Sequence, residues 1–236
     1  MINFHYIKNF IKHYWSATRI DVLHSPFIFD LYNVCIKPKN SNADFVSIEN
    51  LDSKHTNSKR ISQIIFRLVD HYCYRNILGI GTSSGIKRYY IAAALKKNFK
   101  EHEIHFTSIE NDPENSKNTS ENFKQLHLEK FITQKFGNVN DELQNTLKDF
   151  SQIDMAFVDG KHRYEGIINY FHQFLPKTHN DSLLIFDAIY RNEETTKAWE
   201  EIKHHPQVKV TVDLFFMGLV FFRKEQATEH FKLRVW

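Results

Sequence analysis

The stretch that decides the fold is Asn76-Ile-Leu-Gly-Ile-Gly-Thr-Ser-Ser-Gly85, an apolar run that breaks into small residues. It contains three of the chain's seven glycines, and a helix-like stretch over residues 86–95 follows it directly. Glycines clustered between a strand and a helix indicate a turn at which a ligand approaches the backbone closely. A tight turn without a ligand is the other interpretation that the motif allows.

A carboxylate follows at a spacing that suggests a nucleoside. Residues 106–110 form a second apolar run, which ends in Glu110, about 25 residues after Gly85. This is the spacing expected of the group that binds ribose hydroxyls in a nucleotide-type βαβ site. An exposed carboxylate at a strand end is the alternative. Together, the two motifs predict a nucleoside cofactor.

The glycine spacing argues against a dinucleotide. The pattern Gly79-x-Gly81-x-x-x-Gly85 is one residue longer than the Gly-x-Gly-x-x-Gly fingerprint that accommodates a pyrophosphate. The hydroxyls of Thr82 and Ser83 between the glycines suit a carboxylate and an amine better than a diphosphate. An NAD-dependent reductase is therefore disfavoured.

From residue 75 onward, strand-like and helix-like stretches alternate. The predicted strands cover residues 77–81, 104–110, 131–136, 153–158 and 182–186, and helices of about 10 to 15 residues separate or follow them. Repeated βα units predict a doubly wound α/β fold with a mostly parallel sheet. Residues 208–214 and 217–223 predict a closing antiparallel hairpin, and apolar residues at every second position of the tail predict a short edge strand.

The first 59 residues differ from the rest, and we expect them to form a helical N-terminal extension or lid over a domain of residues 60–236. Residues 6–15 are aromatic-rich with helical spacing, and Ser25 with Pro26 has the pattern of a helix start. Residues 37–57 are polar and predict a loop or lid-like segment.

Composition limits the partners. A net charge of +3 over 236 residues disfavours nucleic acid. Cys35 and Cys73 lack metal-ligand spacing and predict buried free thiols in a reducing cytosol. The longest apolar run, residues 214–222, is too short to span a bilayer. We expect a cytoplasmic protein with no membrane partner; the oligomeric state, including a possible homodimer, is open.

Two further motifs follow predicted strands: Asp159-Gly-Lys-His-Arg-Tyr164, and Asp187. With the glycine turn and Glu110, they resemble a class I S-adenosylmethionine-dependent methyltransferase over roughly residues 60–224. The chain is most similar to small-molecule O-methyltransferases of the catechol type, whose fourth strand ends in Asp-Gly-x-His-x-Tyr. The resemblance implies a seven-stranded sheet and methyl transfer to a small-molecule acceptor, with oxygen as the expected acceptor atom.

The resemblance also assigns cofactor-binding positions. The residues against the methionine part of the cofactor are expected in the glycine turn, namely Gly79, Gly81, Thr82, Ser83 and Gly85. Glu110 would accept hydrogen bonds from the ribose hydroxyls. Asn138 stands at the position that usually faces adenine, although Asn after Gly is also ordinary turn chemistry.

The catalytic expectation rests on the loop after the fourth strand. His162 is the candidate general base, with Lys161 as second choice, and Asp159 is expected to contact cofactor or acceptor. Asp159 and Asp187 together could hold a divalent cation such as Mg²⁺. In the alternative, Asp159 merely caps the following helix and His162 is exposed.

Two departures from the family pattern qualify these expectations. The family usually has an acidic residue where this chain has Gly79, which predicts weaker cofactor binding. Ala188 follows Asp187 where metal-dependent relatives carry another ligand, which puts metal dependence in doubt unless His162 supplies it. A non-catalytic cofactor-binding or structural protein on this scaffold is therefore an alternative. A nucleic-acid methyltransferase is disfavoured, because Asp159-Gly-Lys-His replaces the Asn/Asp-Pro-Pro-aromatic tetrapeptide of base-modifying enzymes.

Overall fold

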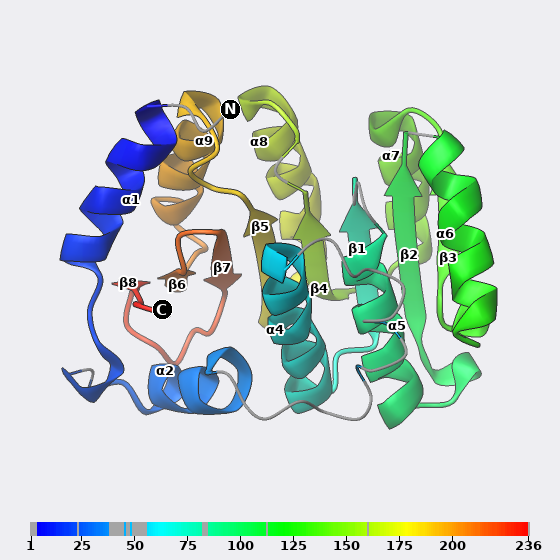
Figure 1. The fold of residues 1–236 in the computed structure, drawn as a ribbon, viewed down its shortest axis with the longest axis horizontal. Helices are drawn as coiled ribbons and strands as arrows, with labels where there is room; N and C mark the ends of the chain where they lie inside the picture. Colours follow the sequence, from blue (N-terminus) through cyan, green and yellow to red (C-terminus); the bar gives the residue numbers. More distant parts are fainter. Residues whose placement is uncertain are drawn as a thin grey trace. The chain divides into compact units, whose positions relative to one another are not determined.

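A computed structural model describes residues 4–22, 24–37, 45, 48, 56–81, 85–111, 113–159 and 161–235 (Figure 1). The chain divides into two units, which are considered in turn: residues 30–150, and residues 1–29 together with 151–236. The predicted extension over residues 1–59 is thus shared between the two units.

The unit of residues 30–150 contains three parallel strands in the order β3-β2-β1. Its strands are β1 (Asn76–Ile80), β2 (His105–Glu110) and β3 (Thr133–Phe136). Its main helices are α4 (Thr56–Tyr72), α5 (Ile86–Asn98), α6 (Pro113–Gln125) and α7 (Val139–Asp149). Ile80 pairs with Ile109, so the glycine turn and Glu110 lie at the same edge of this sheet.

The other unit contains five strands in the order β4-β5-β7-β6-β8. Its strands are β4 (Ile153–Val158), β5 (Thr178–Asp187), β6 (Val210–Asp213), β7 (Met217–Phe221) and β8 (Glu229–Lys232). Its helices are α1 (Phe4–Ser16), α8 (Tyr164–Phe174), α9 (Glu193–Lys203) and the start of α2 (Pro26–Leu31). β4 and β5 are parallel, β7 is antiparallel to both β5 and β6, and β8 is parallel to β6.

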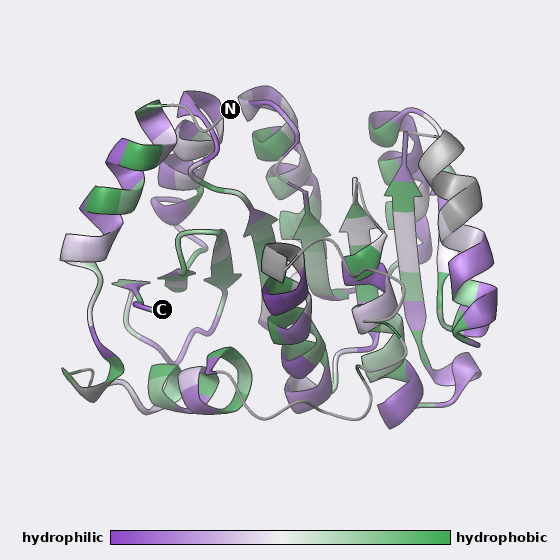
Figure 2. Ribbon diagram, in the orientation of Figure 1, coloured by the Kyte–Doolittle hydropathy of each residue, from purple (hydrophilic) through white to green (hydrophobic). Residues whose placement is uncertain are grey.

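The inner strands β4 and β7 are hydrophobic, as expected of strands that are covered on both faces. Every residue of β4 and of β7 is buried, and Figure 2 shows both strands as predominantly hydrophobic. On β7 the packing leaves no space for a side chain at Gly218: a Cβ there would lie 2.5 Å from the ring of Trp199 on α9. The close approach of α9 to β7 therefore depends on this glycine.

Helix α1 packs beside the end of the hairpin β6–β7. Tyr6 and Phe10, which are each 38% exposed, meet the ring of Phe215 edge-on, with centroids 5.0 and 5.2 Å away. His13 is buried, and its Nε2 lies 3.0 Å from Oδ1 of Asp213, the last residue of β6. These contacts join the first helix to the end of β6, which lies 200 residues further along the chain.

The predicted fold class, α/β with mostly parallel strands and a late antiparallel hairpin, is confirmed. The described residues contain eight strands instead of seven, because the tail forms β8 beside β6. The prediction that both thiols are buried is wrong for Cys73: Cys35 is buried, whereas Cys73 is exposed at a positive φ of 52° after α4. Most of the predicted loop over residues 37–57 lies outside the described residues.

Candidate functional site

The glycine turn of the first unit has a backbone that only glycine adopts easily. Gly81 and Gly85 have φ values of 65° and 71°. A Cβ at Gly85 would also lie 3.0 Å from the side chain of Thr119. Gly85 is the N-cap of α5, and no described side chain caps this helix, so its first N–H groups are oriented toward the turn. Thr82 and Ser83 lie outside the described residues.

Glu110 ends β2 beside this turn, and it is a buried carboxylate instead of an exposed one. Only 2% of its surface is accessible, and its Oε1 lies 3.1 Å from Nη1 of Arg88 on α5. Arg88 is fully buried and also donates hydrogen bonds to the hydroxyls of Ser108 and Thr119. Burial lowers the pKa of Arg88, and the Glu110 carboxylate opposes this shift. The ion pair holds the Glu110 carboxylate in a fixed orientation.

Sequence reasoning missed Arg88. Its signal was present, because two cations, Lys87 and Arg88, stand at the start of an otherwise apolar helix (Ile86-Lys-Arg-Tyr-Tyr-Ile-Ala-Ala), and a cation buried there needs a partner. Arg88 is therefore part of the structure that surrounds Glu110.

Asn138 has a local structural role. It is the N-cap of α7, and its Oδ1 accepts hydrogen bonds from the backbone N–H groups of Asn140 and Asp141, at 2.9 and 3.4 Å. The turn chemistry weighed from the sequence is thus present. Contact of Asn138 with adenine stays a prediction.

In the second unit, the predicted catalytic residues follow two neighbouring parallel strands. Val158 pairs with Phe186, so Asp159 and Asp187 come one position later at the same edge of the sheet. Asp159 is 5% exposed and Asp187 is partly buried. Carboxyl ends of parallel strands are where open α/β sheets bind their ligands.

His162 lies in the loop after β4 and is partly buried. Burial lowers its pKa, and the nearby charge of Asp159 acts in the opposite direction. Nδ1 lies 3.4 Å from the hydroxyl of Tyr170 on α8, and the two rings meet edge-on with centroids 5.0 Å apart. Within the described part of the chain, Nε2 is buried and has no hydrogen-bond partner. Burial therefore favours the neutral imidazole, whose Nε2 is enclosed by protein.

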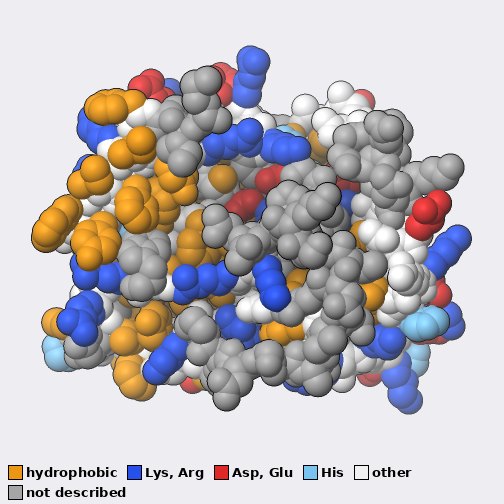
Figure 3. All heavy atoms as spheres, in the orientation of Figure 1, with side chains coloured by type: hydrophobic (Ala, Val, Ile, Leu, Met, Phe, Trp, Pro, Cys, Tyr) orange, Lys and Arg blue, Asp and Glu red, His pale blue; other side chains and the backbone are white. Residues whose placement is uncertain are grey.

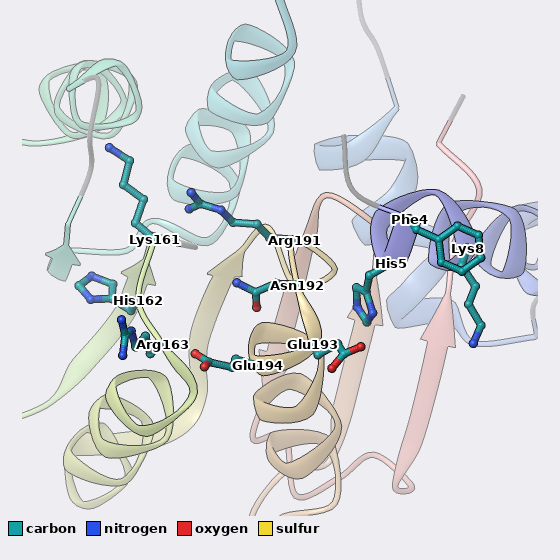
Figure 4. A pocket seen from close by; sticks show the side chains of 10 residues that line it. All are labelled: Phe4, His5, Lys8, Lys161, His162, Arg163, Arg191, Asn192, Glu193 and Glu194. Carbon is teal, nitrogen blue, oxygen red and sulfur yellow. The ribbon is translucent and has the colours of Figure 1, made fainter. Parts of the chain in front are cut away.

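A cavity of about 880 Å³ opens beside His162 within this unit. It is lined by α1, by the loop after β4 and by the loop after β5 (Figure 4). Its cationic side chains are Lys8, Lys161, Arg163 and Arg191, and its acidic side chains are Glu193 and Glu194. In Figure 4 the side chain of Lys161 extends upward from the loop after β4, and that of Arg191 extends to the left from the loop after β5. Lys8 and Arg191 were not identified from the sequence, because neither belongs to a motif.

The described residues give no support to a protein-built metal centre. Among them, no group of three or more His, Cys, Asp or Glu side chains is placed to hold an ion. Asp159 and Asp187 lie at one sheet edge, but Ala188 follows Asp187. These two carboxylates as ligands of Mg²⁺ stay a prediction.

Comparison with known proteins assigns the fold. Residues 78–189 match a family model described as a methyltransferase domain. No curated protein matches the chain. Three similar solved structures are an O-methyltransferase from Bacillus cereus in complex with S-adenosylhomocysteine, an O-methyltransferase from Streptomyces achromogenes in complex with S-adenosylmethionine, and a Podospora anserina methyltransferase bound to S-adenosylhomocysteine.

The three likenesses extend over most of each chain. Identities are 16%, 15% and 12%, in the order given. The matches cover 81%, 81% and 86% of this chain and 94%, 93% and 97% of the others, with TM-scores of 0.57, 0.58 and 0.61. At these identities the structures establish the fold, and the family match places the domain in the middle of the chain. Together they show that this chain has the fold of these methyltransferases and that residues 78–189 match a methyltransferase domain.

Proposed function

We propose that this protein methylates an oxygen atom of a small acceptor that carries an acidic group, with His162 as the general base. The observation that carries the proposal is the imidazole itself: it borders a cavity of about 880 Å³, its Nε2 has no partner among the described residues, and burial lowers its pKa. A hydroxyl acceptor must lose its proton on methylation, and a neutral histidine can take that proton.

The cofactor is expected at the glycine turn. The turn fits the group because Gly81 and Gly85 adopt positive φ values and the start of α5 has no described side-chain cap. While one carboxylate oxygen of Glu110 contacts Arg88, the other can accept a hydrogen bond from a ribose hydroxyl. When bound, S-adenosylmethionine supplies a methyl group on a positively charged sulfur.

The tautomer of His162 decides whether it can act as a base. If Nδ1–H donates to the Tyr170 oxygen, Nε2 carries a lone pair and can accept the acceptor's proton. Burial raises the pKa of Tyr170, so this phenol stays protonated at neutral pH. Asp159 lies close enough to stabilise the imidazolium that forms when the proton arrives. Lys161 is exposed and lines the same cavity, so it is the second candidate.

The charge of the cavity supports an acidic acceptor. Four lysine and arginine side chains line it against two glutamates, and both glutamates belong to the first turn of α9. A carboxylate or phosphate on the acceptor would compensate this excess of positive charge. Phe4, His5 and Lys8 of α1 also line the cavity, which supports the proposed role of the N-terminal segment as its cover.

The first experiment is calorimetric titration of the full chain with S-adenosylhomocysteine. Micromolar binding is expected, and acceptor pairs that differ only in an acidic group, such as hydroxybenzoates and hydroxybenzyl alcohols, are then compared by S-adenosylhomocysteine release. The proposal predicts faster methylation of the acids and loss of turnover in His162→Gln with cofactor binding intact. Equal rates for acids and alcohols would contradict the acidic acceptor.

A non-catalytic protein on this scaffold is the second candidate. The observation that favours it is the complete burial of Glu110 against Arg88, together with the absence of a carboxylate at position 79. It predicts no binding of S-adenosylhomocysteine at millimolar concentration.

We place the protein in the cytoplasm, an assignment supported by the two free thiols. None of the described helices is long and apolar enough to cross a membrane.

A further inference from the structure

Helix α1 has an apolar face that is turned away from the sheet. Four large side chains on it are exposed: Phe4 by 82%, Ile7 by 46%, Ile11 by 53% and Trp15 by 79%. Their positions follow the i, i+3, i+7, i+11 spacing of one helix face, at 100° per residue. We call these four residues the α1 face. Exposed apolar side chains are ordinary when scattered, but a contiguous face marks an interaction site.

The α1 face is distinct from the side of the helix that packs on the rest of its unit. The opposite side of α1 carries Tyr6, Phe10 and His13, which contact Phe215 and Asp213. The helix therefore stays anchored through this side while the α1 face remains exposed. In Figure 3, hydrophobic side chains gather over α1, with lysine and arginine side chains beside them.

The charged side chains that α1 itself contributes beside the α1 face are positive, although Glu193 and Glu194 of α9 line the cavity that Phe4 and Lys8 also line. Lys8 and Lys12 follow Ile7 and Ile11 and so border the face, and Arg19 comes just after the helix. The first acidic residue of the chain is Asp21. Arg234 adds a further cation at the C-terminal end of α1, where its guanidinium lies 4.6 Å from the ring centroid of Tyr14 and donates to the Tyr14 carbonyl oxygen.

We propose that the α1 face binds the surface of an anionic lipid bilayer. An amphipathic helix with lysines bordering a face of Phe, Ile and Trp lies in the plane of a bilayer interface, with the apolar side chains among the acyl chains and the lysines at the phosphates. A helix of 13 residues is about 20 Å long and binds in this way without spanning. Trp15 and Tyr14 suit the headgroup region, where aromatic residues with a polar edge are enriched.

A second copy of the chain fits this face less well than an anionic surface. Pairing two α1 faces would bring Lys8 and Lys12 of both copies together, and the first 20 residues offer no carboxylate to compensate them. A bilayer that contains anionic headgroups supplies the missing negative charge. The proposal departs from the expectation of no membrane partner, which rested on the lack of a spanning segment; surface binding needs no such segment.

The test is co-sedimentation of the full chain with vesicles of phosphatidylcholine alone and of phosphatidylcholine mixed with phosphatidylglycerol. We expect binding to the mixed vesicles, weak binding to the neutral ones, and a decline with added salt. Ile11→Asp is expected to weaken binding more than tenfold, since it places a charge among the acyl chains. Lys12→Gln is expected to weaken it about fivefold, the effect of one cation near such a surface.

Two matched variants serve as controls. Phe136→Asp replaces another exposed aromatic, 41% accessible, on β3 of the other unit, and Lys148→Gln removes an exposed lysine of α7. Both are expected to bind vesicles like the unmodified chain.

Size-exclusion chromatography with light scattering, run in parallel, measures the oligomeric state. The proposal is overturned if the chain does not bind mixed vesicles, if it binds neutral vesicles equally, or if it is a dimer that Ile11→Asp dissociates. S-adenosylhomocysteine binding is measured separately, so failure here leaves the proposed enzymatic function untouched.

Discussion

Nη1 of Arg88 lies 3.1 Å from Oε1 of Glu110, and both side chains are buried at the carboxyl edge of β2. The carboxylate expected to bind the ribose is therefore also the partner of a cation in the protein core. Breaking a buried ion pair from one side is far more costly than replacing both members, because the remaining charge is left without compensation.

Glu110→Ala is therefore expected to lower the free energy of unfolding by about 3–5 kcal/mol, as measured by urea denaturation. The double variant Arg88→Met/Glu110→Leu is expected to recover most of that loss, because it leaves no buried charge. If Glu110 also binds ribose, the double variant folds but loses affinity for S-adenosylhomocysteine. Unchanged affinity in the folded double variant would reduce Glu110 to a structural role.

Gly79 and Gly85 belong to the same motif, but they differ in how well the structure tolerates a side chain. A Cβ at Gly79 would meet its nearest neighbour, Oγ of Ser108, at an ordinary 3.7 Å. At Gly85 it would meet the Thr119 side chain at 3.0 Å, and the φ of 71° disfavours any L-residue. Thermal unfolding should show Gly79→Ala within about 1 kcal/mol of the unmodified protein and Gly85→Ala destabilised by about 1–3 kcal/mol. Equal losses at both positions would contradict this distinction.

The lowered pKa of His162 predicts the pH dependence of activity. The base form persists to lower pH than for an ordinary histidine, so kcat/KM is expected to rise with pH along a limb whose midpoint lies below about 6.5. His162→Gln should lower kcat by about 10²–10⁴-fold and remove this ascending limb. Tyr170→Phe retains the imidazole but loses the oxygen that orients its tautomer, so it should lower kcat/KM without removing the ascending limb. An ascending limb that survives in His162→Gln would assign the base to another group.

The same shift makes a prediction for stability. Below about 6.5 the unfolded chain takes up a proton at His162 that the folded protein resists, since burial lowers the folded pKa. The contribution of His162 to stability is therefore present above that pH and is lost as the pH falls. Urea midpoints measured between neutral and mildly acidic pH should decline less in His162→Gln than in the unmodified protein.

Much of this architecture could be predicted from local patterns. β4 is a run of six buried residues whose ends coincide with the predicted strand, and Ser25 with Pro26 starts α2 as expected, with Ser25 Oγ accepting from the Ile28 N–H group. Both features depend on neighbours in sequence. Periodicity and capping rules describe such features well.

What could not be predicted depends on contacts between distant segments. Nothing near Arg88 in sequence indicates that Glu110, 22 positions later, is its partner, and nothing in α1 indicates that His13 meets Asp213. Likewise, the cavity beside His162 draws Lys8 and Arg191 from segments that carry no motif. Site residues of this kind become visible only once the chain is folded.

The anchoring of α1 at Asp213 provides the last prediction. Asp213 is 1% exposed, lies 3.0 Å from His13 Nε2, and accepts hydrogen bonds from the Tyr190 hydroxyl and the Phe215 N–H group. Tyr190→Phe removes one hydrogen bond to a charged group and should cost about 1.5–3 kcal/mol in urea denaturation. Asp213→Ala removes all three contacts and should cost more, with faster hydrogen exchange over residues 4–16.

The same two variants test the role of α1 at the cavity. Because α1 lines the cavity beside His162, we expect the acceptor KM to rise in both variants while S-adenosylhomocysteine affinity is retained. If hydrogen exchange in α1 is unchanged in Asp213→Ala, the helix is held by its aromatic contacts with Phe215 and not by this carboxylate.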